Sequence, residues 1–119
     1  ILDGTIDMIA TDHAPHSAEE KSAGLEKSMM GVVGLETAFP VMYTYLVKSG
    51  TLTLEKVCKL MSEAPRARFD LLEKDGEFSL WDLDEEYEIN PEDFKTKGRS
   101  TPFAGVKVFG KHIATAVKL

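Results

Sequence analysis

The sequence predicts an α/β protein in which helices occur only in the first part and strands dominate the second. An apolar run over residues 6–11 predicts a buried strand, helical spacing follows over 35–65, and β-rich runs occupy 78–117. This order is typical of the last β/α unit of a barrel followed by a small β-domain. We therefore assign residues 1–69 to the end of a barrel and residues 70–119 to the small β-domain.

The predicted strand runs from Ile6 to Thr11. It is about five residues long, it is β-branched at Ile6 and Ile9, and the Asp3-Gly4 pair before it is a turn signal. A short apolar run of this kind is expected to be buried.

Residues 17–28 form a contrasting polar segment. They are rich in Ser, Ala, Glu and Lys and have no sustained apolar period. We expect a mobile loop of the kind that can close over a substrate. Lys21 and Lys27 are expected to be solvated charges, although either could reach a ligand.

The first helix is predicted by six apolar residues at helical spacing. They are Leu35, Phe39, Met42, Tyr43, Leu46 and Val47. Proline is tolerated only in the first turn of a helix, so Pro40 implies a start at Glu36 or Thr37. The helix is expected to end near Gly50.

The second helix is expected to begin after Thr53, whose hydroxyl can cap its first turn. Leu54, Val57, Leu60 and Met61 would form its apolar face. Pro65 either ends this helix or opens a further short turn.

After Phe69 the pattern changes to short strands. Alternating residues on either side of Gly110-Lys111 predict a hairpin over residues 106–117, packed on one face. His112 lies in this hairpin, and we expect it to face solvent.

Composition excludes several classes of function. The chain has 119 residues and a formal charge of -6, from 14 Lys and Arg against 20 Asp and Glu, which disfavours a nucleic-acid partner. No apolar run has membrane-spanning length, so we expect no membrane partner. The first residue is Ile1, and we expect a piece of a longer soluble protein. The single cysteine, Cys58, is expected to be buried and inert, which suits a reducing cytoplasm.

The chemically richest residues follow the predicted strand. Asp12, His13 and His16 form a D-H-x-x-H string at its carboxyl end, where barrels and open α/β sheets place their active sites. Aspartate supplies an oxygen ligand or a general base, and histidine supplies a nitrogen ligand or a proton donor. The alternative is a polar loop in which Asp12 caps a turn and both histidines are solvated.

Five segments together resemble the carboxyl-terminal part of a dihydroorotase, a family of the amidohydrolase superfamily. They are ATDHAPH (10–16), EEK (19–21), GVVGLETA (31–38), EAPR (63–66) and KGRSTPFAG (97–105). Such an enzyme interconverts N-carbamoyl-aspartate and dihydroorotate in de novo pyrimidine biosynthesis. The resemblance implies the last strand and helices of an amidohydrolase (β/α)8 barrel, followed by strands of a small β-sandwich domain. It also implies a zinc-dependent cyclic amide hydrolase in the cytoplasm, with one or two zinc ions.

The resemblance also implies roles for single residues. Asp12 matches the aspartate that binds the metal and takes the proton from the attacking water. His16 matches a histidine that holds the substrate, and Met30 and Gly31 match a pair whose main chain contacts the pyrimidine ring. For His13 we favour support of the site over metal ligation.

The other metal ligands of the family, and its substrate-binding arginine, have no counterpart in these residues. A catalytic zinc needs about three protein ligands, so we expect the chain by itself to be inactive. The implied partners are the small-molecule substrate, a second copy of the chain, or aspartate carbamoyltransferase. Two alternatives remain: another cyclic amidohydrolase of the hydantoinase or allantoinase type, and a non-catalytic dihydroorotase-like assembly partner of aspartate carbamoyltransferase.

Overall fold

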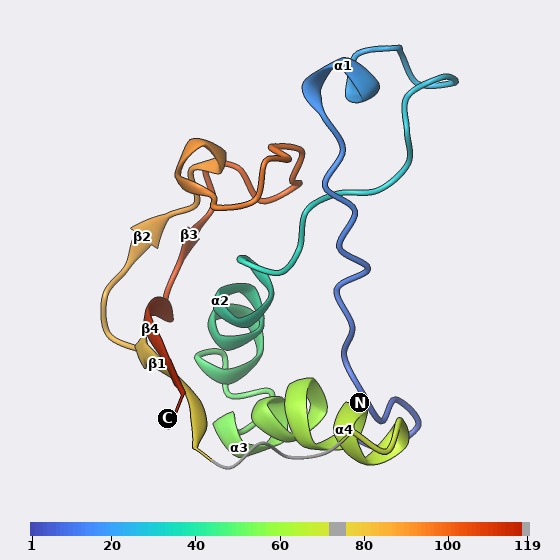
Figure 1. Cartoon of the computed structure of the whole chain (residues 1–119). Helices are drawn as coiled ribbons and strands as arrows, with labels where there is room; N and C mark the ends of the chain where they lie inside the picture. Colours follow the sequence, from blue (N-terminus) through green and yellow to red (C-terminus); the bar gives the residue numbers. More distant parts are fainter. Residues whose placement is uncertain (72–75, 118–119) are drawn as a thin grey trace.

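The computed structural model describes residues 1–71 and 76–117. Figure 1 shows an extended amino-terminal segment that leads to a short helix, a group of helices, and a ribbon of short strands. Helix α2 (Ala38–Met42) lies between the amino-terminal segment and the strands, and α3 (Leu54–Cys58) and α4 (Ala64–Arg68) lie at the bottom of the view (Figure 1). The chain is therefore of the α/β type, with two small sheets in its second part.

The first predicted helix is confirmed. Helix α2 spans Ala38–Met42 and continues as a π-helical turn, η1, over Tyr43–Val47. Thr37 is its N-cap residue, and Pro40 lies buried in its first turn, as the position of the proline requires.

The second predicted helix is also confirmed, and the structure decides the role of its proline. Helix α3 (Leu54–Cys58), the π-helical turn η2 (Lys59–Glu63) and α4 (Ala64–Arg68) follow one another without a break. The Thr53 hydroxyl accepts a hydrogen bond from the Lys56 amide over 3.2 Å. Pro65 lies at the start of α4, so it opens a last helical turn.

The strands pair in a nested antiparallel order. Strand β1 (Glu77–Asp82) pairs with β4 (Lys111–Val117), and β2 (Tyr87–Glu88) pairs with β3 (Lys107–Val108). The loop that reverses the ribbon is therefore the long segment after β2, which also contains the 3-10 turn η3 (Pro91–Asp93).

The predicted hairpin over residues 106–117 is wrong, because β3 and β4 each pair with an earlier strand. Gly110, with φ of 86°, bends the chain between them without reversing it. A Cβ there would lie 3.2 Å from Cε1 of Phe39, so glycine also allows the ribbon to pass close to α2. His112 is exposed, as predicted, and its ring packs edge-on against Trp81.

The core consists of two clusters that meet at one residue. The first comprises Val41, Ile89 and Val108, and the second comprises Leu52, Val57 and Leu60. Met42 packs against both clusters and so links the strand ribbon to the helices. Ile9 packs against the second cluster, and its amide donates to the carbonyl of Leu60 over 2.9 Å.

The buried strand predicted over Ile6–Thr11 is not formed. Ile6 is 51% exposed, and no strand is assigned anywhere between residues 1 and 71. A strand needs a neighbour to accept and donate its backbone hydrogen bonds, and the described residues place none beside this segment. The segment instead runs as extended chain past the helices (Figure 1).

The prediction that Cys58 is buried is wrong. Cys58 is exposed, because its neighbour Val57 takes the inward position on α3. The pKa of its thiol is raised, chiefly by partial desolvation and to a smaller extent by the nearby Glu55 and Glu63 carboxylates. In the described part of the chain, no helix is long and apolar enough to cross a bilayer.

Candidate active site

The candidate site lies where two segments distant in sequence run side by side. His13 and Val32 form a parallel β-bridge, and the Ala14 amide donates to the Val32 carbonyl over 2.8 Å. This contact places the Asp12–His16 segment against the residues that precede α2.

Gly31 allows this close approach. Its φ is 111°, and a Cβ at this position would lie 2.4 Å from the Cβ of Ala14. Both the conformation and the space therefore require glycine. The structure thus brings Gly31 to the D-H-x-x-H segment.

The ring of His13 also joins these two segments by hydrogen bonds. Its Nδ1 atom accepts hydrogen bonds from the amides of Gly34 (3.0 Å) and Leu35 (3.3 Å). An accepting Nδ1 carries no proton, so the hydrogen-bond network assigns the proton of the neutral ring to Nε2. Nδ1 is consequently occupied and cannot also bind a metal. The supporting role expected for His13 stays a prediction.

Asp12 presents an exposed carboxylate in an unusual backbone conformation. Its φ is 46°, in the left-handed region that only glycine, asparagine and aspartate enter at low cost. Its carboxylate makes no hydrogen bond to any residue that the structure describes. The group is therefore free to meet a ligand, a proton or a metal.

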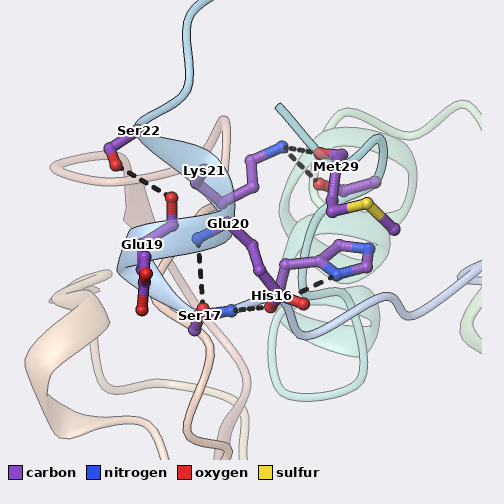
Figure 2. Close-up of polar contacts among 8 residues, drawn as sticks. His16, Ser17, Glu19, Glu20, Lys21, Ser22 and Met29 are labelled. Carbon is purple, nitrogen blue, oxygen red and sulfur yellow. Dashed lines mark hydrogen bonds and ion pairs between the residues drawn. The ribbon is translucent and has the colours of Figure 1, made fainter. Parts of the chain in front are cut away.

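His16 is half-buried beside helix α1 (Ala18–Lys21), as Figure 2 shows. Its Nδ1 atom lies 3.7 Å from Oε2 of Glu20. The same carboxylate accepts a hydrogen bond from the Ser17 amide over 2.8 Å, and the Ser17 hydroxyl accepts one from the Glu20 amide. The hydrogen bonds to Ser17 lower the pKa of Glu20, which keeps its carboxylate charged beside His16.

Lys21 is a residue whose role the sequence did not reveal. Its ammonium donates to the carbonyls of Met29 (2.8 Å) and Gly31 (3.0 Å), so the expectation of a solvated charge is wrong (Figure 2). Met30 lies between these two carbonyls and is 90% exposed. No periodicity links a lysine to carbonyl groups eight and ten residues later, so only the fold shows this contact.

The loop of the β-ribbon completes one side of the site. The Glu36 carboxylate accepts hydrogen bonds from the amides of Lys95 (2.9 Å) and Thr96 (3.0 Å). The Val33 amide donates to the Ser100 carbonyl over 2.9 Å. Gly98 is buried against Pro15, where a Cβ would lie 2.8 Å from the Pro15 Cα. Gly98 and Ser100 belong to the KGRSTPFAG segment, but no local pattern in the sequence predicts these contacts.

The residues present do not form a metal site by themselves. Within residues 1–71 and 76–117, no group of three or more His, Cys, Asp or Glu side chains could hold a metal ion. A catalytic zinc needs about three protein ligands, and Asp12 offers one free carboxylate. The donor set in this chain therefore does not fit a complete zinc centre.

Comparison with known proteins gives a consistent set of relatives, although no family model matches the chain. Dihydroorotases of Bacillus cereus strain B4264, Bacillus thuringiensis strain Al Hakam and Bacillus anthracis strain CDC 684 are each 50% identical to it over 123 aligned positions. The match covers 98% of this chain and 29% of each relative. The predicted resemblance to dihydroorotases is confirmed.

Solved structures give the same picture of the fold. The L-hydantoinase of Arthrobacter aurescens matches 97% of this chain and 28% of its own, with a TM-score of 0.86 and 31% identity. The inactive dihydroorotase-like domain of a Chaetomium thermophilum CAD-like multifunctional protein matches 66% of this chain and 22% of its own. Its TM-score is 0.56 and its identity 28%. The fold of these residues is thus that of the corresponding part of cyclic amidohydrolases.

Proposed function

We propose that this chain is the carboxyl-terminal part of a dihydroorotase, because half of its residues are identical to dihydroorotases along almost its whole length. The reaction would open the ring amide of dihydroorotate to N-carbamoyl-aspartate, and close it in reverse, in cytoplasmic pyrimidine biosynthesis. The identity to the hydantoinase is lower, at 31%, which favours dihydroorotate over other cyclic amides. The single observation that carries the proposal is the identity to dihydroorotases. The contact between the Asp12–His16 segment and the Gly31 main chain supports it.

The roles of the residues follow from this contact. Asp12 would take the proton of the attacking water and pass it to the ring nitrogen that leaves, since a free carboxylate can act first as a base and then as an acid. His16, oriented by Glu20, would hold the substrate. Met30 and Gly31 would contact its ring through the main chain.

We propose one or two zinc ions only for a protein that contains further ligands besides those of this chain. Asp12 would supply one ligand oxygen, and the other ligands would come from residues outside this chain. A zinc ion, when bound, supplies a Lewis acid and lowers the pKa of water. We therefore propose that the isolated chain is inactive.

A second candidate is a non-catalytic dihydroorotase-like protein that assembles with aspartate carbamoyltransferase. The similarity to an inactive dihydroorotase-like domain within a multifunctional protein supports it. In that case the residues of the candidate site would serve only to hold the fold together.

The deciding experiment is an assay of dihydroorotate hydrolysis by a longer protein that contains these residues, with zinc added. We expect activity on dihydroorotate and little on hydantoin. Asp12→Asn should lower kcat by about 100-fold or more, the range of a general acid–base group. Asp7→Asn, another exposed carboxylate nearby, is the control and should have no effect.

Two results would contradict the proposal. A longer protein that shows no activity with zinc would favour the non-catalytic assembly partner. Ring opening by the purified 119-residue chain would overturn the claim that the isolated chain is inactive.

A further inference from the structure

The contacts of Lys21 connect α1 to the main chain on both sides of Met30. The Lys21 ammonium has three donors, and the carbonyls of Met29 and Gly31 occupy two of them. Lys21 is half-buried, and the bond to Gly31 is partly shielded from solvent. Charged donors make stronger hydrogen bonds than neutral ones, and shielding strengthens them further.

Because the peptide bond is planar, the contacts of Lys21 also orient the amide that follows the bound Met29 carbonyl. In a trans peptide the carbonyl and the following amide point in opposite directions. Because the Met29 carbonyl points to Lys21, the Met30 amide points away from it. The amides of Met30 and Gly31 make no hydrogen bond to the residues that the structure describes, so both donors stay available.

The free donors lie beside the D-H-x-x-H segment. Gly31 packs against Ala14, and the Val32 carbonyl accepts the Ala14 amide. Hydrogen bonds within the loop add order, since the Met29 amide donates to the Glu20 carbonyl and the Ser28 hydroxyl donates to the Lys21 carbonyl. Lys21 is the one charged side chain that binds the loop main chain on both sides of Met30 in the described part of the chain.

We infer that Lys21 is a positioning residue for substrate binding, which holds the Met29–Gly31 main chain so that its free amides meet the carbonyl oxygens of a cyclic amide. This inference rests on the proposed function for the identity of the ligand. It assigns Lys21 no contact with the substrate.

The first test measures backbone amide hydrogen exchange in the 119-residue chain. Lys21→Met keeps the aliphatic stem and removes the ammonium. We expect the Ser28 and Met29 amides to exchange roughly tenfold faster, because the loop loses two hydrogen bonds to a charged group. Lys21→Arg should exchange nearly as slowly as the native chain.

The matched control is Lys27→Met. Lys27 is an exposed lysine of the same loop, and its ammonium makes no hydrogen bond in the described part of the chain. The Lys27→Met variant should leave the exchange rates of the Ser28 and Met29 amides unchanged. The Val57 amide in α3, far from the loop, reports whether each variant has folded.

The second test uses kinetics of the longer enzyme that contains these residues. Lys21→Met should raise KM for dihydroorotate about tenfold with kcat within about twofold, because it disturbs binding and leaves Asp12 in place. Lys21→Arg should restore KM to within about threefold of the native value.

The outcomes separate the inference from the proposed function. Unchanged exchange in Lys21→Met, or a loss of kcat with an unchanged KM, would overturn the positioning role. If the native longer protein has no dihydroorotase activity, the proposed function fails. Faster exchange in Lys21→Met would still support Lys21 as the residue that orders this main chain.

Discussion

The Nδ1 atom of His13 accepts a hydrogen bond from the Gly34 amide, 3.0 Å away and 21 residues later in the chain. Gly34 begins the turn that leads into α2, because its carbonyl accepts the Ala38 amide. The amides at the start of a helix have no partner within it, and the Thr37 side chain does not cap α2. From a distant segment, His13 accepts hydrogen bonds from the amides of Gly34 and Leu35, the first two residues of the turn that precedes α2.

The first prediction concerns this contact. His13→Ala should lower the free energy of unfolding by about 1–2 kcal/mol, because two amides lose their acceptor. His13→Asn should lose less, since an amide oxygen can take the place of Nδ1. Urea unfolding measures both. Equal losses in the two variants would show that ring packing, and not the hydrogen bonds, stabilises this junction.

The second prediction concerns the hydrogen bonds that join Glu36, just before α2, to the loop between β2 and β3. Glu36→Ala should destabilise the chain by about 1–3 kcal/mol, because the amides of Lys95 and Thr96 lose a charged acceptor. Glu26→Ala, at an exposed position in the polar loop, is the control and should stay within about 0.5 kcal/mol of the native chain. Thermal or urea unfolding gives the comparison, and equal effects of the two changes would refute it.

Local signals in the sequence predicted the helices correctly. The apolar period and Pro40 located α2, and the Thr53 hydroxyl located the start of α3, because both depend on interactions within a few residues. The strand pairing was predicted less well. The turn signal at Gly110 was real, but the partners of β3 and β4 lie more than 15 residues earlier, where no local pattern reaches.

For the candidate site, the sequence predicts the residue types but not the contacts between them. Asp12, His16 and Gly31 were all named from the resemblance, and the structure brings Gly31 to the segment that contains the other two. The contacts of Lys21 and Glu36 were missed. Each joins a side chain to main-chain groups, which carry no residue-specific signal in a sequence.

The third prediction is a pH dependence at α1. The pKa of Glu20 is lowered in the folded chain, chiefly by the Ser17 amide. A lowered carboxyl pKa means that the charged form stabilises the start of α1, where Ser17 is the N-cap residue. This stabilisation is complete above the ordinary glutamate pKa and is lost progressively as pH falls through the lowered value. The Ser17 amide resonance should therefore shift with a midpoint below the ordinary glutamate range, and Glu20→Gln should remove that shift. A midpoint above that range would contradict the hydrogen bonds that Ser17 and Glu20 exchange at the start of α1.

The fourth prediction compares two glycines of one loop. Gly31 and Gly24 both have positive φ, of 111° and 83°, but only Gly31 is crowded. A Cβ at Gly31 would meet the Cβ of Ala14 at 2.4 Å, whereas nothing lies within 4 Å of a Cβ at Gly24. Gly24→Ala should therefore cost about 1 kcal/mol for its conformation alone. Gly31→Ala should cost about 1–3 kcal/mol more, because the loop must also move away from Ala14. Unfolding in urea measures the costs, and exchange of the Ala14 amide, which donates to Val32, shows whether the two segments have separated. If both variants lose the same stability and the Ala14 amide stays protected, the close contact between the loop and the D-H-x-x-H segment does not stabilise the site.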